Sequence, residues 1–381
     1  MPEAYLRSAA MARFGNTPER GLEELVHPPV VEAIQRAGLS PREIDAVVGG
    51  SYASGMLTAQ RAIRGLGLAG RPVVNLENAC ASSAFAIHYA VSMVRQGTYR
   101  HCLVVGVEQL SRSGSSQVPL NADDPDVQVG LMMPASYALR AQRYLHEFGV
   151  SPAQLAGVAV KNRANGAHNP WARFQAAVTL EEVLGSRMIA DPLTLLQCCA
   201  GGDGAAAVVV SAEPGGATAL RFAASAVSAG EDTSRPRDLS RSHLTASTAR
   251  KAYAEAGMGP EDVDVIELHD AFTIGELMYT EALGLCHPGE GATLLESGAT
   301  AIDGRVAVNP SGGLLSRGHP VGATGVAQVC ELFWQLRGEA GARQGRPRRL
   351  GLAHTTGGGI AEYDHAACAI QMIVREERLG G

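Results

Sequence analysis

The chain has 381 residues, of which 46% are hydrophobic and 18% are charged, a composition typical of a globular protein with two or three core-forming units. The net charge of −6 and the lack of a Lys/Arg-rich run give no reason to expect nucleic-acid binding. No apolar stretch approaches the roughly 18 residues of a membrane span, and the N-terminus lacks the apolar core of a signal peptide. We therefore expect no membrane insertion.

The cysteines indicate a reduced, cytoplasmic setting. They are odd in number and follow no regular framework, and none forms a CxxC pair, so we expect neither disulfides nor a bound metal. A cysteine in such a setting is more often a small buried hydrophobe than a reagent, so a catalytic role has to come from context. The seven are Cys80, Cys102, Cys198, Cys199, Cys286, Cys330 and Cys368.

An internal repeat organises the chain. Residues 37–48 (AGLSPREIDAVV) and residues 256–267 (AGMGPEDVDVIE) each predict a helix end, a Pro-containing turn and a short strand. In both copies the next elements are a strand, a turn of small residues, an amphipathic helix and another apolar strand. Alternating strands and helices favour parallel sheets covered by helices, so the sequence predicts a duplicated, layered α/β fold.

The repeat divides the chain into a first half over residues 1–215 and a second half over residues 216–381, joined near SAEPGGAT (211–218). An inserted region at about 111–197 interrupts the first half. It contains a predicted helix, MMPASYALRAQRYLHEFG, and an ordered loop, DPLTLLQ. We expect this region to lie over the functional site.

Cys80 follows the apolar strand PVVNL and precedes a helix that is predicted to begin at about Ala81. Such an elbow places a side chain at a helix N-terminus, where the helix dipole and free N–H groups favour a thiolate and supply donors for an oxyanion. The small residues from Ala81 to Ala84 leave room for a substrate. A buried cysteine at a tight turn would give the same pattern.

Two histidines are candidates for proton transfer. His319 lies in NPSGGLLSRGHPVGATG, a glycine-rich loop without a Walker pattern, where a core histidine would be unusual. His269 follows the strand VDVIEL, and Asp270 is expected to cap the next helix. His269 could merely end its strand. However, the repeat places the strand ends of both halves on one side of the fold, where open α/β sheets bind ligands.

The glycine run in AHTTGGGIAEY follows a predicted strand near the C-terminus. Consecutive glycines allow close backbone approach, and their N–H groups could form a second oxyanion hole. A flexible turn would have the same composition.

Taken together, NACASS, HDAF, GGLLSRGHPVGATG and AHTTGGG, in this order, resemble the thiolase superfamily over nearly the whole chain. The likeness is strongest to sterol-carrier-protein-x-type and archaeal acetoacetyl-CoA thiolases. It implies the duplicated five-layered αβαβα thiolase fold with an inserted loop domain. It also implies an acyl-CoA C-acyltransferase that cleaves or forms a β-ketoacyl-CoA through an acyl-cysteine intermediate, with coenzyme A as a substrate and no bound cofactor.

The resemblance assigns roles to individual residues. Cys80 is the acylated nucleophile, His319 activates it and helps form one oxyanion hole, and His269 orients a water or lines that hole. The second hole uses the backbone N–H groups of Cys80 and Gly357. Met133 and Gly313 are expected to bind substrate.

One role stays unassigned. Thiolases carry a second cysteine that acts as acid and base on the α-carbon, either in a Cys-x-Gly motif or in His-Asp-Cys-Phe. Those two positions are occupied here by Thr355 and Ala271. The possible substitutes are His269, His354, Tyr363 or a group from a partner, and the sequence does not choose among them.

Three other functions compete with thiolysis. A thiolase-like retro-aldol lyase on a β-hydroxyacyl-CoA would dispense with the nucleophilic cysteine and use tyrosines, so Cys80 argues for thiolysis. A non-catalytic scaffold would not need Cys80, His269 and His319 together. A ketosynthase would carry an Asn motif where this chain has GHPVGATG.

The resemblance also predicts partners. We expect a homodimer, and the resemblance also allows it to be the core of a heterotetramer with a small OB-fold, zinc-ribbon protein that helps bind the acyl-CoA. Few basic residues in the inserted region could hold CoA, namely Lys161, Arg163 and Arg173. The sequence does not determine the acyl chain of the substrate, which could be branched, aryl, dicarboxylic or a steroid side chain.

Overall fold

The computed structural model describes residues 2–112, 122–216, 218–230, 238–358 and 365–377. Its main sheet has ten strands in two sets of five. The first set is β1 (Tyr5–Met11), β2 (Ala46–Gly50), β3 (Val73–Leu76), β4 (His101–Gln109) and β7 (Asp203–Ser211). The second set is β8 (Thr218–Ala229), β9 (Val265–Glu267), β10 (Ala307–Val308), β11 (Leu350–Gly357) and β12 (Ala367–Glu377).

The two sets have the same topology, which confirms the duplication. Their spatial orders are β3-β2-β4-β7-β1 and β10-β9-β11-β12-β8, so the strands of each set follow one pattern. They meet where Phe222 N donates to Ala4 O at 2.9 Å, between β8 and β1. Only β2, β3 and β4, and likewise β9, β10 and β11, pair in parallel. The other pairs are antiparallel, so the expectation of parallel sheets holds for three strands of each set.

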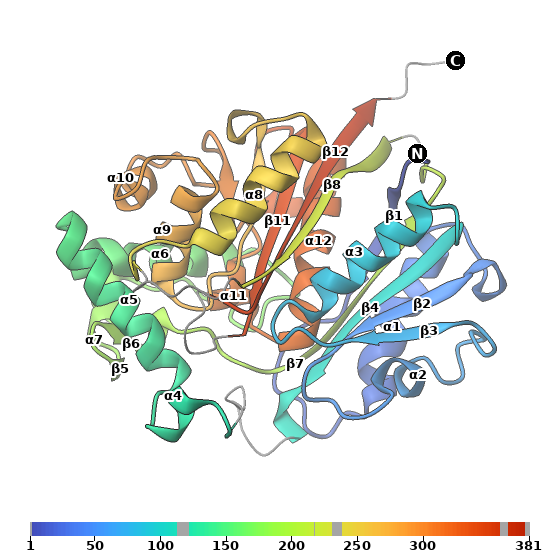
Figure 1. The fold of residues 1–381 in the computed structure, drawn as a ribbon, viewed down its shortest axis with the longest axis horizontal. Helices are drawn as coiled ribbons and strands as arrows, with labels where there is room; N and C mark the ends of the chain where they lie inside the picture. The colour runs from blue at the N-terminus through green and yellow to red at the C-terminus, as the bar shows by residue number, and fades with distance from the viewer. Residues whose placement is uncertain (1, 113–121, 217, 231–237, 359–364, 378–381) are drawn as a thin grey trace.

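Helices separate and cover the two sets of strands (Figure 1). Between them pack α3 (Ser82–Arg95) and α12 (Thr324–Arg337), and every residue of α12 from Thr324 to Leu336 is buried. The outer face of the first set is covered by α1 (Leu22–Arg36) and α2 (Thr58–Ala62), and that of the second set by α8 (His243–Ala256). These are the five predicted layers.

The repeated sequence folds the same way in both copies. The first copy runs from the end of α1 through Gly38, at φ +66°, and the 3₁₀ turn η1 (Pro41–Glu43) to β2. The second runs from the end of α8 through Gly257, at φ +64°, and η4 (Pro260–Asp262) to β9. Glycine is needed at both helix ends because the chain turns there through left-handed backbone conformations.

The chain between β4 and β7 lies to one side of the sheet, coloured green in Figure 1. It packs against α9 (Thr273–Ala282), α10 (Gly291–Glu296) and α11 (Gly313–Arg317) of the second half. The helix expected in MMPASYALRAQRYLHEFG is α5. The elements of this region are η2 (Leu110–Arg112), α4 (Pro125–Gln128), α5 (Met133–Phe148), α6 (Pro152–Gly166), α7 (Leu180–Gly185), β5 (Met188–Ala190), β6 (Leu193–Thr194) and η3 (Leu195–Gln197).

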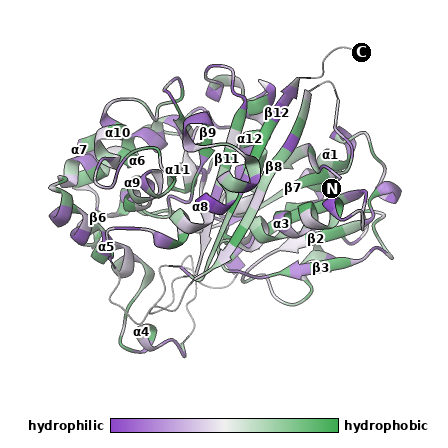
Figure 2. Ribbon diagram, turned by 45° about the horizontal axis from the view of Figure 1, so that its top comes forward, coloured by the Kyte–Doolittle hydropathy of each residue, from purple (hydrophilic) through white to green (hydrophobic). Residues whose placement is uncertain are grey.

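Hydrophobic residues concentrate on the central strands, as Figure 2 shows. The 3₁₀ turns η5 (Val321–Ala323) and η6 (Gly341–Arg343) flank α12. Among the helices of the described residues, none combines the length and apolarity needed to cross a membrane.

Candidate active site

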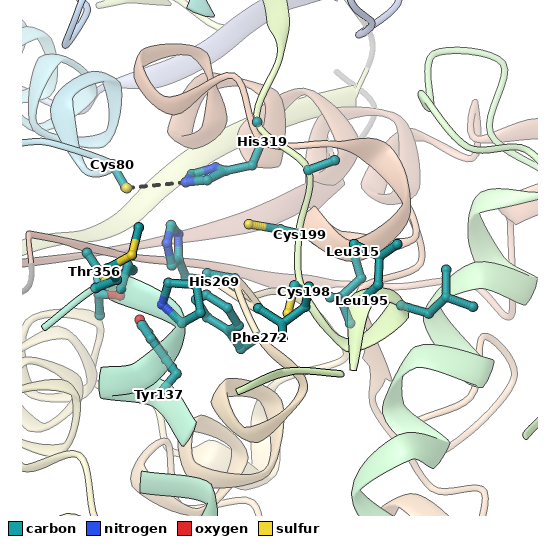
Figure 3. A pocket seen from close by; sticks show the side chains of 18 of the residues that line it. Cys80, Tyr137, Leu195, Cys198, Cys199, His269, Phe272, Leu315, His319 and Thr356 are labelled. Carbon is teal, nitrogen blue, oxygen red and sulfur yellow. Dashed lines mark hydrogen bonds between the residues drawn. The ribbon is translucent and has the colours of Figure 1, made fainter. Parts of the chain in front are cut away.

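One cavity of about 820 Å³ collects side chains from distant parts of the sequence (Figure 3). Cys80 comes from the turn after β3, His269 from the turn after β9, His319 from the loop after α11, and Thr356 from the end of β11. The region between β4 and β7 forms another wall. Apolar side chains of that region in the lining include Val127, Leu131, Met132, Met133, Ile189, Leu195 and Leu196.

The turn that carries Cys80 is a tight elbow. Ala79 has a φ of +48°, a conformation that is uncommon for a residue with a side chain. The elbow is held by hydrogen bonds from Asn78 N to Ser82 Oγ (2.9 Å) and from Ala81 N to Asn78 O (3.0 Å). Helix α3 begins at Ser82, so Cys80 lies just before the helix N-terminus, as the sequence predicts.

Cys80 is hydrogen-bonded to His319, with 3.2 Å between Sγ and Nε2. The other ring nitrogen, Nδ1, lies 2.8 Å from Thr324 Oγ1, whose own proton goes to Pro320 O at 3.0 Å. Because the threonine oxygen has donated its only proton, Nδ1 must be the donor in its bond with Thr324. Nε2 is therefore the proton acceptor and can act as a base toward the Cys80 thiol.

Burial keeps both groups neutral. It raises the pKa of Cys80 to about 12, with the carboxylate of Glu108 adding to the effect. It lowers the pKa of His319 to about 3, and the positive charge of Arg317 contributes. In this structure the cost of desolvating the thiolate outweighs the helix N-terminus. The prediction that Cys80 is a thiolate is therefore wrong. Before substrate binds, the pair is a thiol that faces a neutral imidazole.

His269 stands against the ring of His319, with 5.1 Å between ring centroids and an interplanar angle of 82°. Burial, followed by the interaction with the neighbouring His319 ring, lowers the pKa of His269 well below the ordinary value. Its Nδ1 is buried and has no hydrogen-bond partner among the described residues. A neutral imidazole in this place can hydrogen-bond to a substrate oxygen or a water.

A buried ion pair ties together the segments that carry the two histidines. Arg317 Nη1 lies 3.1 Å from Glu267 Oε2, and both side chains are fully buried. Glu267 also accepts from Ser311 Oγ at 2.6 Å. Each ion stands two residues from a histidine, so the pair fixes the position of His269 relative to His319.

Asp270 caps a different helix from the one expected. Its carboxylate accepts from Leu314 N at 2.7 Å, at the start of α11, whereas α9 has no side-chain cap. Gly313 belongs to this packing, because a Cβ there would lie 2.2 Å from Asp270 Oδ2. Gly313 does not line the cavity, whereas Met133, the other residue expected to bind substrate, does.

Gly357 lies against the Cys80 elbow. A Cβ at this position would lie 2.2 Å from Asn78 O and 2.9 Å from Ala81 N. The close approach requires glycine and brings two backbone segments together, as an oxyanion hole built from Cys80 and Gly357 would require.

The structure shows where the other residues considered as acid and base for the α-carbon lie. His354 does not line the cavity. Its Nε2 is hydrogen-bonded to Thr245 Oγ1 at 3.0 Å, and its ring packs 4.7 Å from that of Tyr279. Thr355 Oγ1 donates to Gln328. Tyr363 lies outside the described residues.

Two of the three basic residues expected to hold CoA line the cavity. Arg163 and Arg173 flank the ring of Phe174, at 4.4 and 5.2 Å from its centroid. Lys161 does not line this cavity and pairs with Glu276 at 2.9 Å.

Sequence reasoning missed several cavity residues. Among them are Cys198, Cys199, Tyr137, Arg187 and His365. The cysteine doublet in LQCCAGG is visible in the sequence. However, its neighbours in the chain do not predict which distant strand ends lie beside it.

Cys80, His269 and His319 offer donor atoms that all lie within 4.8 Å of one another, a spacing that a metal ion could bridge. Nitrogen and sulfur donors of this kind suit zinc. The same atoms are the nucleophile, the base and a hydrogen-bonding group of the site, and the absence of a bound metal stays a prediction.

A thiol bonded to a base, set before a helix N-terminus in a largely apolar cavity, is the arrangement of enzymes that transfer acyl groups through a cysteine. Residues 5–214 match the family model described as thiolase, N-terminal domain, and residues 224–368 match thiolase C-terminal domain-like. The chain therefore belongs to the thiolase family.

Named relatives confirm the predicted kinship. The chain is 38% identical to benzoylsuccinyl-CoA thiolase subunit BbsB of Thauera aromatica, over 96% of this chain and 98% of that protein. It is 36% identical to an acetyl-CoA acetyltransferase of Methanothermobacter thermautotrophicus, over 94% and 97%. It is 33% identical to human sterol carrier protein 2, over 94% of this chain and 70% of that protein.

Among solved structures, the chain resembles one described as Ltp2-ChsH2(DUF35) aldolase. The TM-score is 0.85 at 25% identity, over 99% of each chain. Together these comparisons confirm the thiolase fold and the enzyme class: the protein is a thiolase-type acyltransferase.

Proposed function

We propose that the protein cleaves or forms a β-ketoacyl-CoA by transferring the acyl group to Cys80. The hydrogen bond between the Cys80 thiol and Nε2 of His319 carries this proposal, because the bond to Thr324 fixes Nε2 as the base. Both members of this pair are uncharged until a substrate binds and the proton moves from Cys80 to His319.

The chemistry follows from the geometry. His319 takes the thiol proton of Cys80 as the Cys80 sulfur attacks the keto carbon. Donors at His319 and His269 serve one oxyanion, and the N–H groups of Cys80 and Gly357 serve the other. The Cα–Cβ bond then breaks, an acyl-CoA leaves, and CoA removes the acyl group from Cys80 in a second half-reaction.

A retro-aldol lyase is the second candidate. The structural neighbour described as an aldolase points to it. So does one feature of the cavity, the Tyr137 hydroxyl hydrogen-bonded at 2.8 Å to His365 Nε2, a phenol–imidazole pair that could move a proton on a β-hydroxyacyl-CoA.

Mass spectrometry separates the two candidates. The protein would be incubated with acetoacetyl-CoA and 2-benzoylsuccinyl-CoA, and the thiolase function predicts an acyl adduct on Cys80. Cys80→Ala should abolish the adduct and the turnover, whereas Cys286→Ala, outside the cavity, should keep both. Cleavage of a β-hydroxyacyl-CoA that survives Cys80→Ala, without any adduct, would establish the lyase instead.

The substrate belongs, in our proposal, to the breakdown of lipid or aromatic acids. The largely apolar lining and the likeness to a benzoylsuccinyl-CoA thiolase subunit support this assignment. Arg163 and Arg173, placed in the same cavity, are suited to a carboxylate on the acyl chain or to a phosphate of CoA.

The assembly proposed is a cytoplasmic homodimer, with a small OB-fold, zinc-ribbon partner completing a heterotetramer. All seven cysteines are free thiols, and β3 is an edge strand of the sheet. One relative is itself described as a subunit, and the neighbouring aldolase is described together with a DUF35 protein. Tight CoA binding and full turnover by the purified chain alone would contradict the need for a partner.

A further inference from the structure

Cleavage of a β-ketoacyl-CoA needs a second proton carrier. When the Cα–Cβ bond breaks, its electron pair collects on the α-carbon as an enolate, and that carbon must receive a proton. His319 already handles the proton of Cys80. Ala271 has no ionisable group, and Thr355 donates to Gln328.

We propose that Cys199 is the acid and base for the α-carbon, an assignment that rests on the proposed acyl transfer to Cys80. Cys199 lines the same cavity as Cys80. Figure 3 shows its sulfur directed toward the space in front of His269 and His319, across from Cys80. The α-carbon is one bond beyond the carbon that Cys80 attacks, so its proton carrier has to lie in the same cavity, within reach of that neighbouring carbon.

Backbone hydrogen bonds fix Cys199 in this place. Its N–H donates to Ala271 O at 2.8 Å, and Cys198 forms an antiparallel bridge with Phe272. Two residues later, Gly201 bridges His319, whose own N–H donates to Ala200 O at 3.0 Å. Residues 198–201 therefore run between the segments that carry the two histidines, and backbone hydrogen bonds hold the Cys199 residue on that segment.

The electrostatics fit a proton donor. Burial, with Cys80 as the next cause, raises the pKa of Cys199 well above the ordinary value. The thiol is therefore protonated before the reaction, as a donor to an enolate must be. Among the described residues, no side chain accepts a hydrogen bond from the Cys199 sulfur.

Other thiols and hydroxyls of the cavity are already engaged. Cys198 Sγ donates to Thr194 O at 3.3 Å, and the hydroxyl of Tyr137 is bonded to His365. Burial raises the pKa of Tyr137 well above its ordinary value, so it is a weaker acid still.

The proton balance closes over one cycle. The Cys199 S–H bond breaks as a C–H bond forms at the α-carbon, which leaves the shorter acyl-CoA and a Cys199 thiolate. The thiolate then takes the proton of the incoming CoA thiol. The resulting CoA thiolate attacks the acyl group on Cys80, whose sulfur leaves and takes back the proton held by His319. Both cysteines are then thiols again and His319 is neutral.

Hydrogen exchange at the α-carbon tests this role directly. The full chain would be incubated with acetyl-CoA in D₂O and deuterium at the α-carbon measured by mass spectrometry, beside acylation of Cys80 by the same compound. Cys199→Ser should lower the exchange and the cleavage of a β-ketoacyl-CoA by at least about 100-fold. Acylation of Cys80 should change by less than about tenfold, because it alters no bond at the α-carbon.

Cys286→Ser, at a thiol outside the cavity, is the control and should leave exchange within about threefold. Cys199→Ala is a second variant at the site, and a thermal melt of each variant shows whether it has kept its fold. Exchange that persists in Cys199→Ser, or that falls equally in Cys286→Ser, would overturn the proposal. Failure of the proposed function looks different, since the unaltered protein would then form no adduct on Cys80.

Discussion

At the Cys80–His319 pair, one hydroxyl group decides which imidazole nitrogen is the base. Thr324 Oγ1 donates to Pro320 O and accepts from His319 Nδ1, so Nε2 keeps its lone pair toward the thiol. Without that acceptor, the neutral ring could carry its proton on Nε2, and Nε2 could then not accept the proton of Cys80. The residue scale therefore sets the chemistry of the pair.

Thr324→Val tests this arrangement. The variant keeps the shape of the side chain and removes the acceptor, so we expect acylation of Cys80 to slow by about tenfold or more. Thr324→Ser restores the hydroxyl and should recover most of the rate. Stopped-flow or quenched mass spectrometry of the acyl adduct measures both. Equal rates in the valine variant and the unaltered protein would show that the tautomer is fixed in another way.

At the scale of elements, the site depends on loops that meet from both halves. The end of β11 touches the elbow between β3 and α3, and the buried pair of Glu267 and Arg317 joins the end of β9 to the end of α11. Breaking such a buried pair costs about 3–5 kcal/mol, because the remaining charge stays buried. The elements are therefore fixed relative to one another by contacts that carry no chemistry themselves.

Gly357→Ala tests the contact between β11 and the elbow. The added Cβ would meet Asn78 O at 2.2 Å, so the elbow must shift and the second oxyanion hole must open. We expect turnover to fall by about 100-fold or more, a loss of the size seen when one oxyanion donor is removed. Gly185→Ala, in α7, meets nothing within 4 Å and is the control. A Gly357→Ala variant with normal turnover would contradict the proposed hole.

At the scale of the whole molecule, burying the site between two halves of the fold costs stability in acid. The pKa of His319 is about 3 in the folded chain and about 6.5 when unfolded. Below pH 6.5 the unfolded chain binds a proton that the folded chain refuses. The contribution of His319 to stability is thus lost as pH falls from about 6.5 to about 3, at up to about 1.4 kcal/mol per pH unit.

His319→Gln should weaken this dependence. Urea unfolding at pH 7 and at pH 5 gives the free energy of unfolding of both proteins. We expect the drop between the two pH values to be smaller in the variant by about 1–2 kcal/mol. His243→Gln, at the start of α8 and outside the cavity, is the control and should show the drop of the unaltered chain. An equal drop in His319→Gln would mean that His319 is not buried as a neutral base.

The sequence by itself determined the duplication, the Cys80 elbow and the two histidines. These features are local: a strand followed by small residues and a helix, or a histidine among glycines, is determined by neighbours in the chain. The same holds for the two copies of the turn between α1 and β2 and between α8 and β9. The family resemblance then supplied the reaction class, which the comparisons confirm.

Only the tertiary structure decided which groups meet. Asp270 caps α11 instead of α9 because the two halves bring Leu314 N to it, and no local pattern predicts that contact. Burial reversed the expected charge of Cys80, since desolvation depends on everything packed around the thiol. Cys199 faces the cavity because its segment pairs with Ala271 and His319, about 70 and 120 residues away along the chain. Contacts over such separations come from folding, and they placed the Cys199 thiol in the same cavity as Cys80.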